Sequence, residues 1–361
     1  VAKKGLFSFI RAGKSSKYIP LFLFLLLPGL LSTLWADFNW SGFRWSVLLL
    51  LQFLLAFLLI KPRRWSKYDK IAKLFVYTVT VLALVSIIRS FTDLSFLGLS
   101  LPVNSFTRLN GWMRSPNHFS AYIALGLLIE WHYYMTRSDK SIFRIFKIGL
   151  FFLVIILSGS RGTLVALFLV LIVESLSSLR NISAINLVKR CGLYFFVLLM
   201  TYLLHGAVLE FFGHTTQDFG EKILRVDEQA YDNSRVEIWT LALSSWMDGD
   251  LWSKLGGFGK EASYTLTGRS THNSYLTYLI DFGIIYTVGL LLIVFYFLWR
   301  TWKIASYSKD YLLIFSIILF LASRSVTNNI FGGVGVFQII FNMCLIITLS
   351  HHEGEKDSLR S

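Results

Sequence analysis

Three residues of this 361-residue chain combine reactive side chains with settings that can use them: Arg161, Arg235 and His272. His272 lies in the stretch GRSTHNSYLTYLIDFGIIY, where a polar loop becomes an apolar run. An imidazole that is neutral near pH 7 can act as a general base towards a hydroxyl group. The alternative is a histidine that packs and forms hydrogen bonds. We expect no metal site, because no second His or Cys stands at ligand spacing.

Arg161 lies in the stretch LSGSRGTLV, a short turn between two apolar runs. The serines and glycines around it allow backbone N–H groups to converge, and a helix is expected to begin there. An arginine, converging N–H groups and a helix N-terminus together form an anion site. The alternative is an arginine whose guanidinium extends to a lipid phosphate.

Arg235 lies in the stretch NSRVEIWTLALSSW. Ser234 and Glu237 have the spacing of a capping box, which predicts that Arg235 is the first helical residue. A cation at that position opposes the helix dipole unless an anion binds between them. The alternative is a solvated charge beside a cap. At helical spacing, Arg235 shares a face with four residues that suit a membrane surface or a transmembrane bundle: Ile238, Trp239, Ala242 and Trp246.

Other residues near these stretches support narrower expectations. If His272 is helical, it shares a face with Leu276, Leu279 and Gly283, and the glycine allows another helix to approach closely. The stretch KLGGFGKE lacks the spacing of a phosphate-binding loop and is expected to be a flexible approach to the site. Glu174, inside an apolar run, is expected to face a structural protein partner, with a proton relay as the alternative.

The elements that must position these residues are membrane-spanning helices. Hydrophobic residues make up 55% of the chain and charged residues 16%, whereas soluble domains carry about 25% charged residues. Several apolar runs approach the roughly 20 residues that cross a bilayer as a helix. We therefore predict an all-α polytopic transmembrane bundle of about ten spans, and up to twelve. The spans are expected near residues 19–36, 45–60, 71–88, 118–135, 145–159, 162–179, 191–211, 274–299, 310–324 and 331–350.

The chain has a net charge of +14, and the positions of its positive residues follow the alternation of these spans. Lys and Arg gather in the segments that lie on one side when the N-terminus is inside, which is the bias of cytoplasmic loops. The charge therefore indicates topology and contact with membrane lipids rather than binding of nucleic acid, with both termini cytoplasmic. The predicted regions are N-terminal spans at 1–209, one large periplasmic loop with short helices at 210–273, C-terminal spans at 274–350 and a tail at 351–361.

Several further residues on the outer side are candidates for substrate binding. Asn117 follows a proline at a helix start, where its alternative role is a cap. Arg324 is an outer cation that can contact sugar or phosphate. The full set of predicted substrate-binding residues is Asn273, Tyr275, Asn117, His118, Arg114 and Arg108.

Four stretches resemble elements of the O-antigen ligase family and the related O-antigen polymerases. The pattern H-[N/S/Q]-x9-G-x-x-[G/T/Y] is matched through His272, Asn273, Gly283 and Tyr286. SGSRGTLVAL is similar to the family's S-R-G element, SRVEIWTLAL to its R-x-x-x-W element, and GWMRSPNHFSAYIAL to its Pro-Asn element. The resemblance covers roughly residues 100–350. The family usually has twelve spans, whereas about ten are predicted here, so either the N-terminal part is shorter or the chain has spans beyond these ten.

The resemblance implies an inverting, metal-independent GT-C-type glycosyltransferase of the bacterial inner membrane, with its active site on the periplasmic face and no cofactor. The donor would be a glycan on undecaprenyl pyrophosphate, whose pyrophosphate Arg161 and Arg235 would bind. His272 would take the proton from the acceptor hydroxyl. A ligase uses a lipid A–core sugar as acceptor, and a polymerase uses another lipid-linked repeat unit. A transporter of lipid-linked glycans is the competing class, but it needs ionisable residues deep in several spans.

Overall fold

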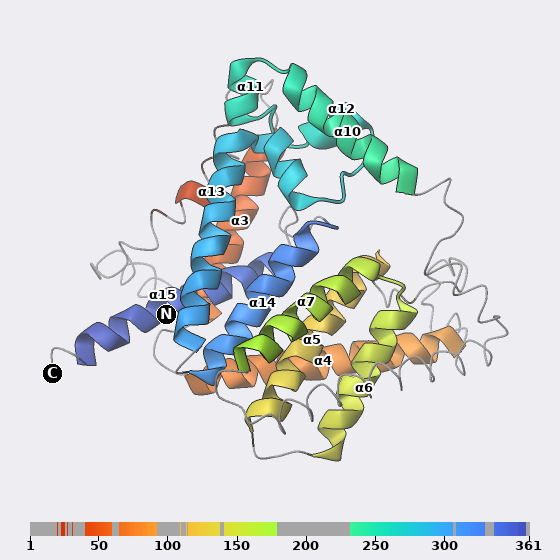
Figure 1. The fold of residues 1–361 in the computed structure, drawn as a ribbon, viewed down its shortest axis with the longest axis vertical. Coiled ribbons are helices and arrows are strands. Elements are labelled where there is room, and N and C mark those ends of the chain that lie inside the picture. Colours follow the sequence, from red (N-terminus) through yellow and green to blue (C-terminus); the bar gives the residue numbers. More distant parts are fainter. Residues whose placement is uncertain are drawn as a thin grey trace. The chain divides into compact units, whose positions relative to one another are not determined.

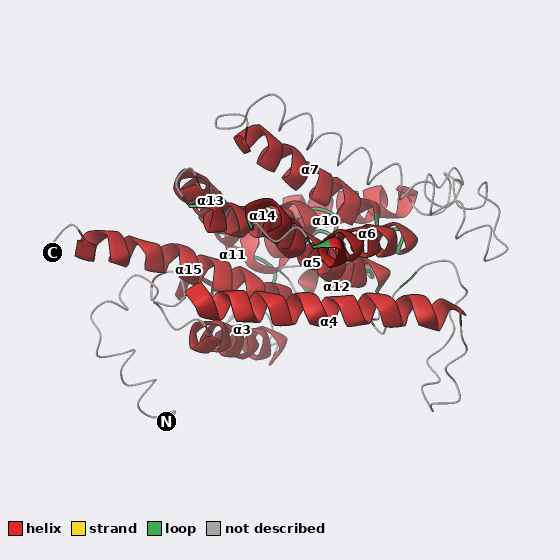
Figure 2. Cartoon of the chain, turned by 90° about the horizontal axis from the view of Figure 1, so that it is seen from below, coloured by secondary structure: helices red, strands yellow, loops and turns green. Residues whose placement is uncertain are grey.

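The computed structural model describes residues 40–59, 65–91, 115–137, 141–178, 232–305, 308–328 and 336–358, with a few single positions outside these ranges. All elements in these ranges are helices (Figure 2). This confirms the all-α prediction for the described part of the chain. The predicted span at 191–211 and nearly all of the span at 19–36 lie outside the described residues. The helices are α3 (Trp40–Leu59), α4 (Trp65–Phe91), α5 (Pro116–Thr136), α6 (Ile142–Leu157), α7 (Arg161–Ser178), α10 (Asp232–Asp248), α11 (Leu251–Gly256), α12 (Ala262–Thr267), α13 (Ser274–Ala305), α14 (Lys309–Ser325) and α15 (Val336–Ser358).

Each of the remaining predicted spans coincides with one helix. The ends differ mostly by a few residues, as expected where apolar runs define the helix but do not define its caps. The largest difference is at the C-terminus, where α15 continues to Ser358 through most of the predicted tail. Two helices are long and apolar enough to cross a membrane, at Asp69–Ile88 and Ser274–Ala305, among the residues described. Two shorter apolar helices lie at Trp40–Ala56 and Phe337–Leu349.

The chain forms two compact units, each built from segments that are far apart in sequence. Unit 1 contains Val1–Arg63, Tyr231–Lys303 and Ser325–Ser361. Unit 2 contains Arg64–Ala230 and Ile304–Arg324. The four regions predicted from the sequence are continuous stretches of chain. Each compact unit instead combines segments from more than one of these regions.

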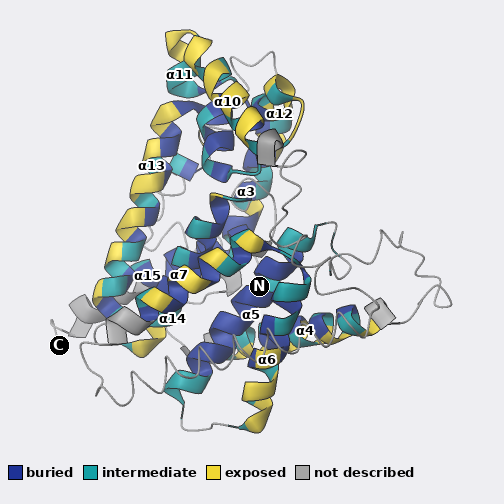
Figure 3. Cartoon of the chain, turned by 45° about the vertical axis from the view of Figure 1, so that its right-hand side comes forward, coloured by how far each residue is buried: buried dark blue, intermediate teal, exposed yellow. Residues whose placement is uncertain are grey.

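In unit 2, α5 is the central helix. It packs against α4, α6 and α7, and its side chains are buried almost without interruption from Phe119 to Tyr133 (Figure 3). By contrast, α4 exposes an apolar stripe at helical spacing that includes Leu74, Tyr77 and Val81. A soluble surface rarely carries such a stripe.

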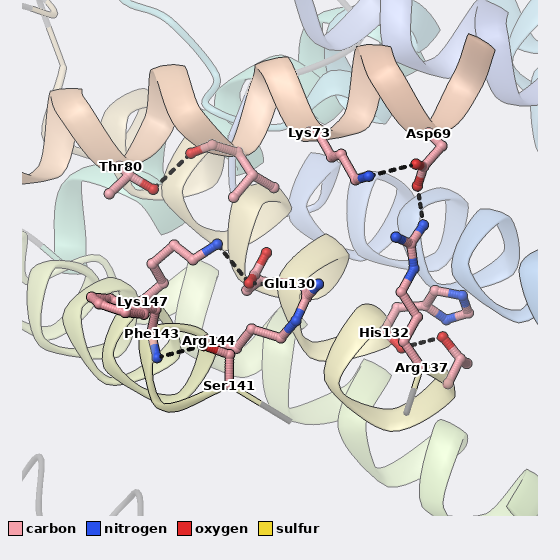
Figure 4. A network of polar contacts seen from close by, with 12 residues as sticks. Asp69, Lys73, Thr80, Glu130, His132, Arg137, Ser141, Phe143, Arg144 and Lys147 are labelled. Carbon is pink, nitrogen blue, oxygen red and sulfur yellow. Dashed lines mark hydrogen bonds and ion pairs between the residues drawn. The ribbon is translucent and has the colours of Figure 1, made fainter. Parts of the chain in front are cut away.

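One end of unit 2 holds a network of charged residues from neighbouring helices (Figure 4). Arg137, just after α5, bonds to Asp69 at the start of α4, and its guanidinium lies 4.1 Å from the ring centre of Tyr133. Glu130 is buried and accepts hydrogen bonds from Arg144 (3.2 Å) and Lys147 (2.7 Å) on α6. These residues all come from helix ends that the positive charge pattern assigns to the inner side. Glu130 is not among the residues predicted from the sequence, although a carboxylate within an apolar run itself indicates a buried partner.

Glu174 on α7 also has a protein partner in this unit. Its side chain is buried and accepts a hydrogen bond from the Ser316 hydroxyl on α14. The expected structural partner is thereby confirmed.

Unit 1 is organised around α13. α3 packs against α15, and its Trp45 ring lies 4.9 Å from the ring centre of Phe282 and 6.4 Å from that of Tyr278 on α13. α10, α11 and α12 gather at the N-terminal end of α13 (Figure 1). The outer face of α13 carries exposed apolar side chains, among them Ile285, Leu292 and Phe295.

Candidate functional site

The turn that contains Arg161 lies at the opposite end of unit 2 from the charged network. α6 ends at Leu157, Gly159 takes a left-handed conformation (φ 61°), and α7 begins at Arg161. The expected helix start is confirmed. Arg161 is exposed, and the first N–H groups of a helix have no acceptor within it. An exposed guanidinium at a helix N-terminus is one component of an anion site.

The start of α5 meets this turn. Pro116 is the first helical residue and Ser115 precedes it as the cap residue, so Asn117 lies inside the first turn and is not the cap. The Ser120 hydroxyl donates to the Asn117 carbonyl (3.0 Å) and lies 2.8 Å from the Thr163 hydroxyl on α7. His118 lies beside Asn117 in the same turn, and both form further interactions. The structure thus brings the Pro-Asn and S-R-G elements together, while Arg108 and Arg114 lie outside the described residues.

Arg324 joins the same place from α14. Its side chain is only 1% exposed. The guanidinium donates hydrogen bonds to Thr163 and Ser160 in the S-R-G element. The expectation that Arg324 contacts sugar or phosphate is corrected here, because its guanidinium is buried against protein acceptors.

In unit 1, Arg235 lies at the end of the first turn of α10. The helix begins at Asp232, so the capping-box prediction placed its start too late. The apolar face of α10 packs on the start of α13, because Ala242, Leu276 and Ile280 form one buried cluster with Trp239 and Trp246 against it. Of the two expected environments for this face, the helical bundle is the one observed. The physical reason is the number of apolar side chains that α13 offers at its first turns.

A hydrogen bond ties α10 to the segment that contains His272. The Trp239 indole Nε1 donates to the Thr271 carbonyl at 2.7 Å. Trp239 lies one turn after Arg235, and Thr271 directly precedes His272. The R-x-x-x-W element and the histidine element therefore lie side by side in one unit.

His272 itself is not helical. It takes a left-handed conformation (φ 50°) and precedes α13, so it does not share a helix face with Leu276, Leu279 and Gly283 as predicted. His is one of the few residue types enriched in this conformation. Left-handed non-glycine residues are strained and cluster at functional sites. His272 is half-buried and forms further interactions, one of them from its backbone N to the Ser270 hydroxyl (3.4 Å).

The residues on both sides of His272 are firmly held. The Thr271 hydroxyl lies 2.6 Å from the Thr277 hydroxyl, and the Ser274 hydroxyl donates to the Asn328 carbonyl at 3.0 Å. The Asn273 side chain accepts hydrogen bonds from the N–H groups of Tyr275 (3.0 Å) and Leu276 (3.1 Å). Asn273 is thus the N-cap of α13, and Tyr275 lies in its first turn. Their predicted roles in substrate binding stay predictions.

Gly283 breaks α13 and admits a loop rather than another helix. Its backbone (φ 77°, ψ 178°) is non-helical, which releases the carbonyls of Ile280 and Asp281 from the helix. Those carbonyls accept hydrogen bonds from Phe258 N (2.8 Å) and Gly259 N (3.0 Å). The glycine loop KLGGFGKE is therefore docked into the break. The expectation of a flexible approach was wrong, because backbone hydrogen bonds hold this loop.

Asp281 holds the rest of the glycine loop, and it is not among the residues predicted from the sequence. Its carboxylate is fully buried and accepts from Lys260 Nζ (3.0 Å), Glu261 N (3.2 Å) and Ser263 N (2.9 Å). Its position inside an apolar run is the feature of the sequence that indicates a buried carboxylate with protein partners. The glycine loop overlaps the end of α11 and follows it. At the start of α11, the cap residue Asp250 accepts a hydrogen bond from Ser253 N, which lowers the pKa of the Asp250 carboxyl.

We expect Gly283→Ala to destabilise the protein strongly. A Cβ at this position would lie 2.2 Å from the Leu255 carbonyl oxygen, and only glycine adopts this backbone conformation readily. The expected loss is roughly 3 kcal/mol or more in the free energy of unfolding, seen as a lower thermal midpoint in detergent. Gly149→Ala on α6 is the matched control, because a Cβ there meets nothing within 4 Å. Equal midpoints for the two variants would contradict the docked loop.

Comparison with models of known protein families found no match to this chain, and comparison with curated proteins found none either. Among the described residues, no three His, Cys, Asp or Glu side chains lie close enough together to hold a metal ion. The expectation of metal-independent chemistry stays a prediction.

Proposed function

We propose that this protein is a polytopic glycosyltransferase of the bacterial inner membrane, of the O-antigen ligase type, with its active site on the periplasmic face. The observation that carries the proposal is the hydrogen bond from Trp239 to the Thr271 carbonyl. It joins two stretches that resemble separate family elements, the one that contains Arg235 and the one that contains His272. The pairing of the other two elements through Ser120 and Thr163 is a second observation in its favour.

The membrane assignment rests on apolar surface and charge. α4 and α13 are long enough to span a bilayer and expose apolar stripes, and lipid tails are as apolar as such side chains. In unit 2, residues from predicted inner segments meet at one end, while the start of α5, the start of α7 and Arg324 meet at the other. This arrangement is the one expected of spans that alternate in direction.

The proposed reaction transfers a glycan from undecaprenyl pyrophosphate to an acceptor hydroxyl. The acceptor oxygen bonds to the anomeric carbon of the donor sugar, from the face opposite the leaving group, while the bond from that carbon to the pyrophosphate oxygen breaks. His272 takes the hydroxyl proton. Arg161 and Arg235 bind the pyrophosphate, whose negative charge increases as it leaves. Preorganised donors of this kind commonly supply the largest part of catalysis.

A deletion strain tests the proposal through its surface polysaccharide. If the protein is a ligase, polymer accumulates on the lipid carrier and none reaches lipid A–core. If it is a polymerase, core that carries a single repeat unit appears instead. Unchanged lipopolysaccharide and unchanged lipid-linked glycan in the deletion strain would refute both forms of the proposal, and repeat units trapped on the cytoplasmic face would indicate a transporter.

A further inference from the structure

Arg324 is a buried cation whose guanidinium bonds to the first turns of two helices. Its Nε donates to the Thr163 hydroxyl at 3.0 Å, and one terminal nitrogen donates to the Ser160 hydroxyl at 3.3 Å and the Asn117 carbonyl at 3.5 Å. Burial of a charge is costly unless the charged group is hydrogen-bonded, and the fold meets that requirement here. An ionisable residue in an apolar helix therefore commonly marks a functional site.

The partners of Arg324 define the start of α7. The Ser160 carbonyl accepts from the N–H groups of Thr163 (3.1 Å) and Leu164 (3.2 Å), as a cap residue does. The hydroxyls of Ser160 and Thr163 lie 2.9 Å apart. Ser160 and Thr163 are buried, whereas Arg161 between them is exposed.

The planar guanidinium suits this task because it presents donors in a fixed fork. One terminal nitrogen of the guanidinium donates both to Ser160 at the start of α7 and to the Asn117 carbonyl in the first turn of α5, and so bridges the two helices. A lysine carries the same charge, but its single ammonium cannot reproduce that fixed geometry. The side chain of Arg324 donates to hydroxyl and carbonyl acceptors in this turn and in the first turn of α5.

We propose that Arg324 is the positioning residue of the pyrophosphate site: its fork holds the first turn of α7 so that Arg161 and the N–H groups of that turn face the leaving group. This inference rests on the proposed function for the identity of the anion. Arg324 acts through Arg161 and the turn, and it does not itself touch the donor.

The test compares Arg324→Lys with Ser323→Ala in the full-length protein reconstituted in nanodiscs. Ser323 is the adjacent residue on α14, and its hydroxyl bonds only to the Leu319 carbonyl of its own helix among its named partners. We expect Arg324→Lys to raise the donor KM at least about tenfold, the effect of losing a hydrogen bond to a charged group, with the acceptor KM unchanged. Ser323→Ala should keep both KM values. A wild-type donor KM in Arg324→Lys would overturn the inference, as would a loss confined to the amount of folded protein.

A pair of substitutions at Thr163 tests the same contact from the side of the acceptor, in case Arg324→Lys does not fold. Thr163→Ser retains the hydroxyl acceptor and should retain the wild-type donor KM, whereas Thr163→Val removes it and should raise that KM. Equal values for the two variants would contradict the positioning role.

Binding of undecaprenyl pyrophosphate separates this inference from the proposed reaction. The same variants are titrated with that lipid, and Arg324→Lys and Thr163→Val should bind it at least about tenfold more weakly. Wild-type protein that binds the lipid but transfers no glycan would refute the reaction and leave the positioning role supported. Wild-type protein that does not bind the lipid would refute the positioning role as well.

Discussion

Replacing His272 by asparagine is expected to abolish glycan transfer while the protein stays folded in the membrane. General-base catalysis contributes about 10²- to 10⁴-fold, which in a membrane assay is near-complete loss. Asparagine is the informative substitution because, like histidine, it tolerates the left-handed conformation observed at this position (φ 50°). His272→Asn therefore removes the base without adding backbone strain, whereas alanine would change both.

Donor binding and pH dependence complete this test. His272→Asn should bind undecaprenyl pyrophosphate as the wild type does, since the arginines carry that contact. Wild-type transfer should fall as acid protonates the imidazole, because a protonated ring cannot accept the hydroxyl proton. His272→Gly, which also suits positive φ, should behave like His272→Asn. A folded His272→Asn protein that transfers glycan at the wild-type rate would exclude the base role and favour a histidine that only packs.

Substitution of Arg161 or Arg235 is expected to give the second large loss. Arg→Ala at either position should lower transfer by about 10²-fold or more, the usual effect of removing a donor from developing negative charge. Arg→Lys should restore activity only in part, because an ammonium lacks the bidentate fork that matches phosphate oxygens. The loss should include weaker binding of undecaprenyl pyrophosphate.

Arg269→Ala is the control for the arginine variants, since Arg269 is an exposed cation in the loop just before His272 and has no assigned role. It should keep wild-type transfer and lipid binding. Normal turnover by the Arg161→Ala, Arg235→Ala double variant would remove the proposed leaving-group site. Loss of transfer in Arg269→Ala equal to that in Arg235→Ala would show that general positive charge, not a specific site, is responsible.

The positions of the helices follow from the sequence because the information is local. An apolar run of sufficient length predicts a helix wherever it stands, and Ser and Gly around Arg161 predict where α7 begins. In unit 2, helix ends that the charge pattern assigns to the same side do meet, Asp69 with Arg137 and Glu130 with Arg144, and the side of the membrane stays a prediction. A carboxylate in an apolar run must find a partner, which is why Glu174 could be assigned a structural contact in advance.

The site geometry was decided only by tertiary structure, because it depends on residues that are distant in sequence. The left-handed backbone of His272 is held by Thr271, which α10 contacts through Trp239. The break at Gly283 exists together with the loop whose N–H groups, at Phe258 and Gly259, satisfy the released carbonyls. A prediction from hydrophobic periodicity assumes an uninterrupted helix, so it predicts neither the left-handed residue before α13 nor the break within it. Arg324 was likewise predicted to be an outer cation, whereas the fold buries it against Ser160 and Thr163. The burial of a residue depends on its neighbours in space, which its own stretch of sequence does not specify.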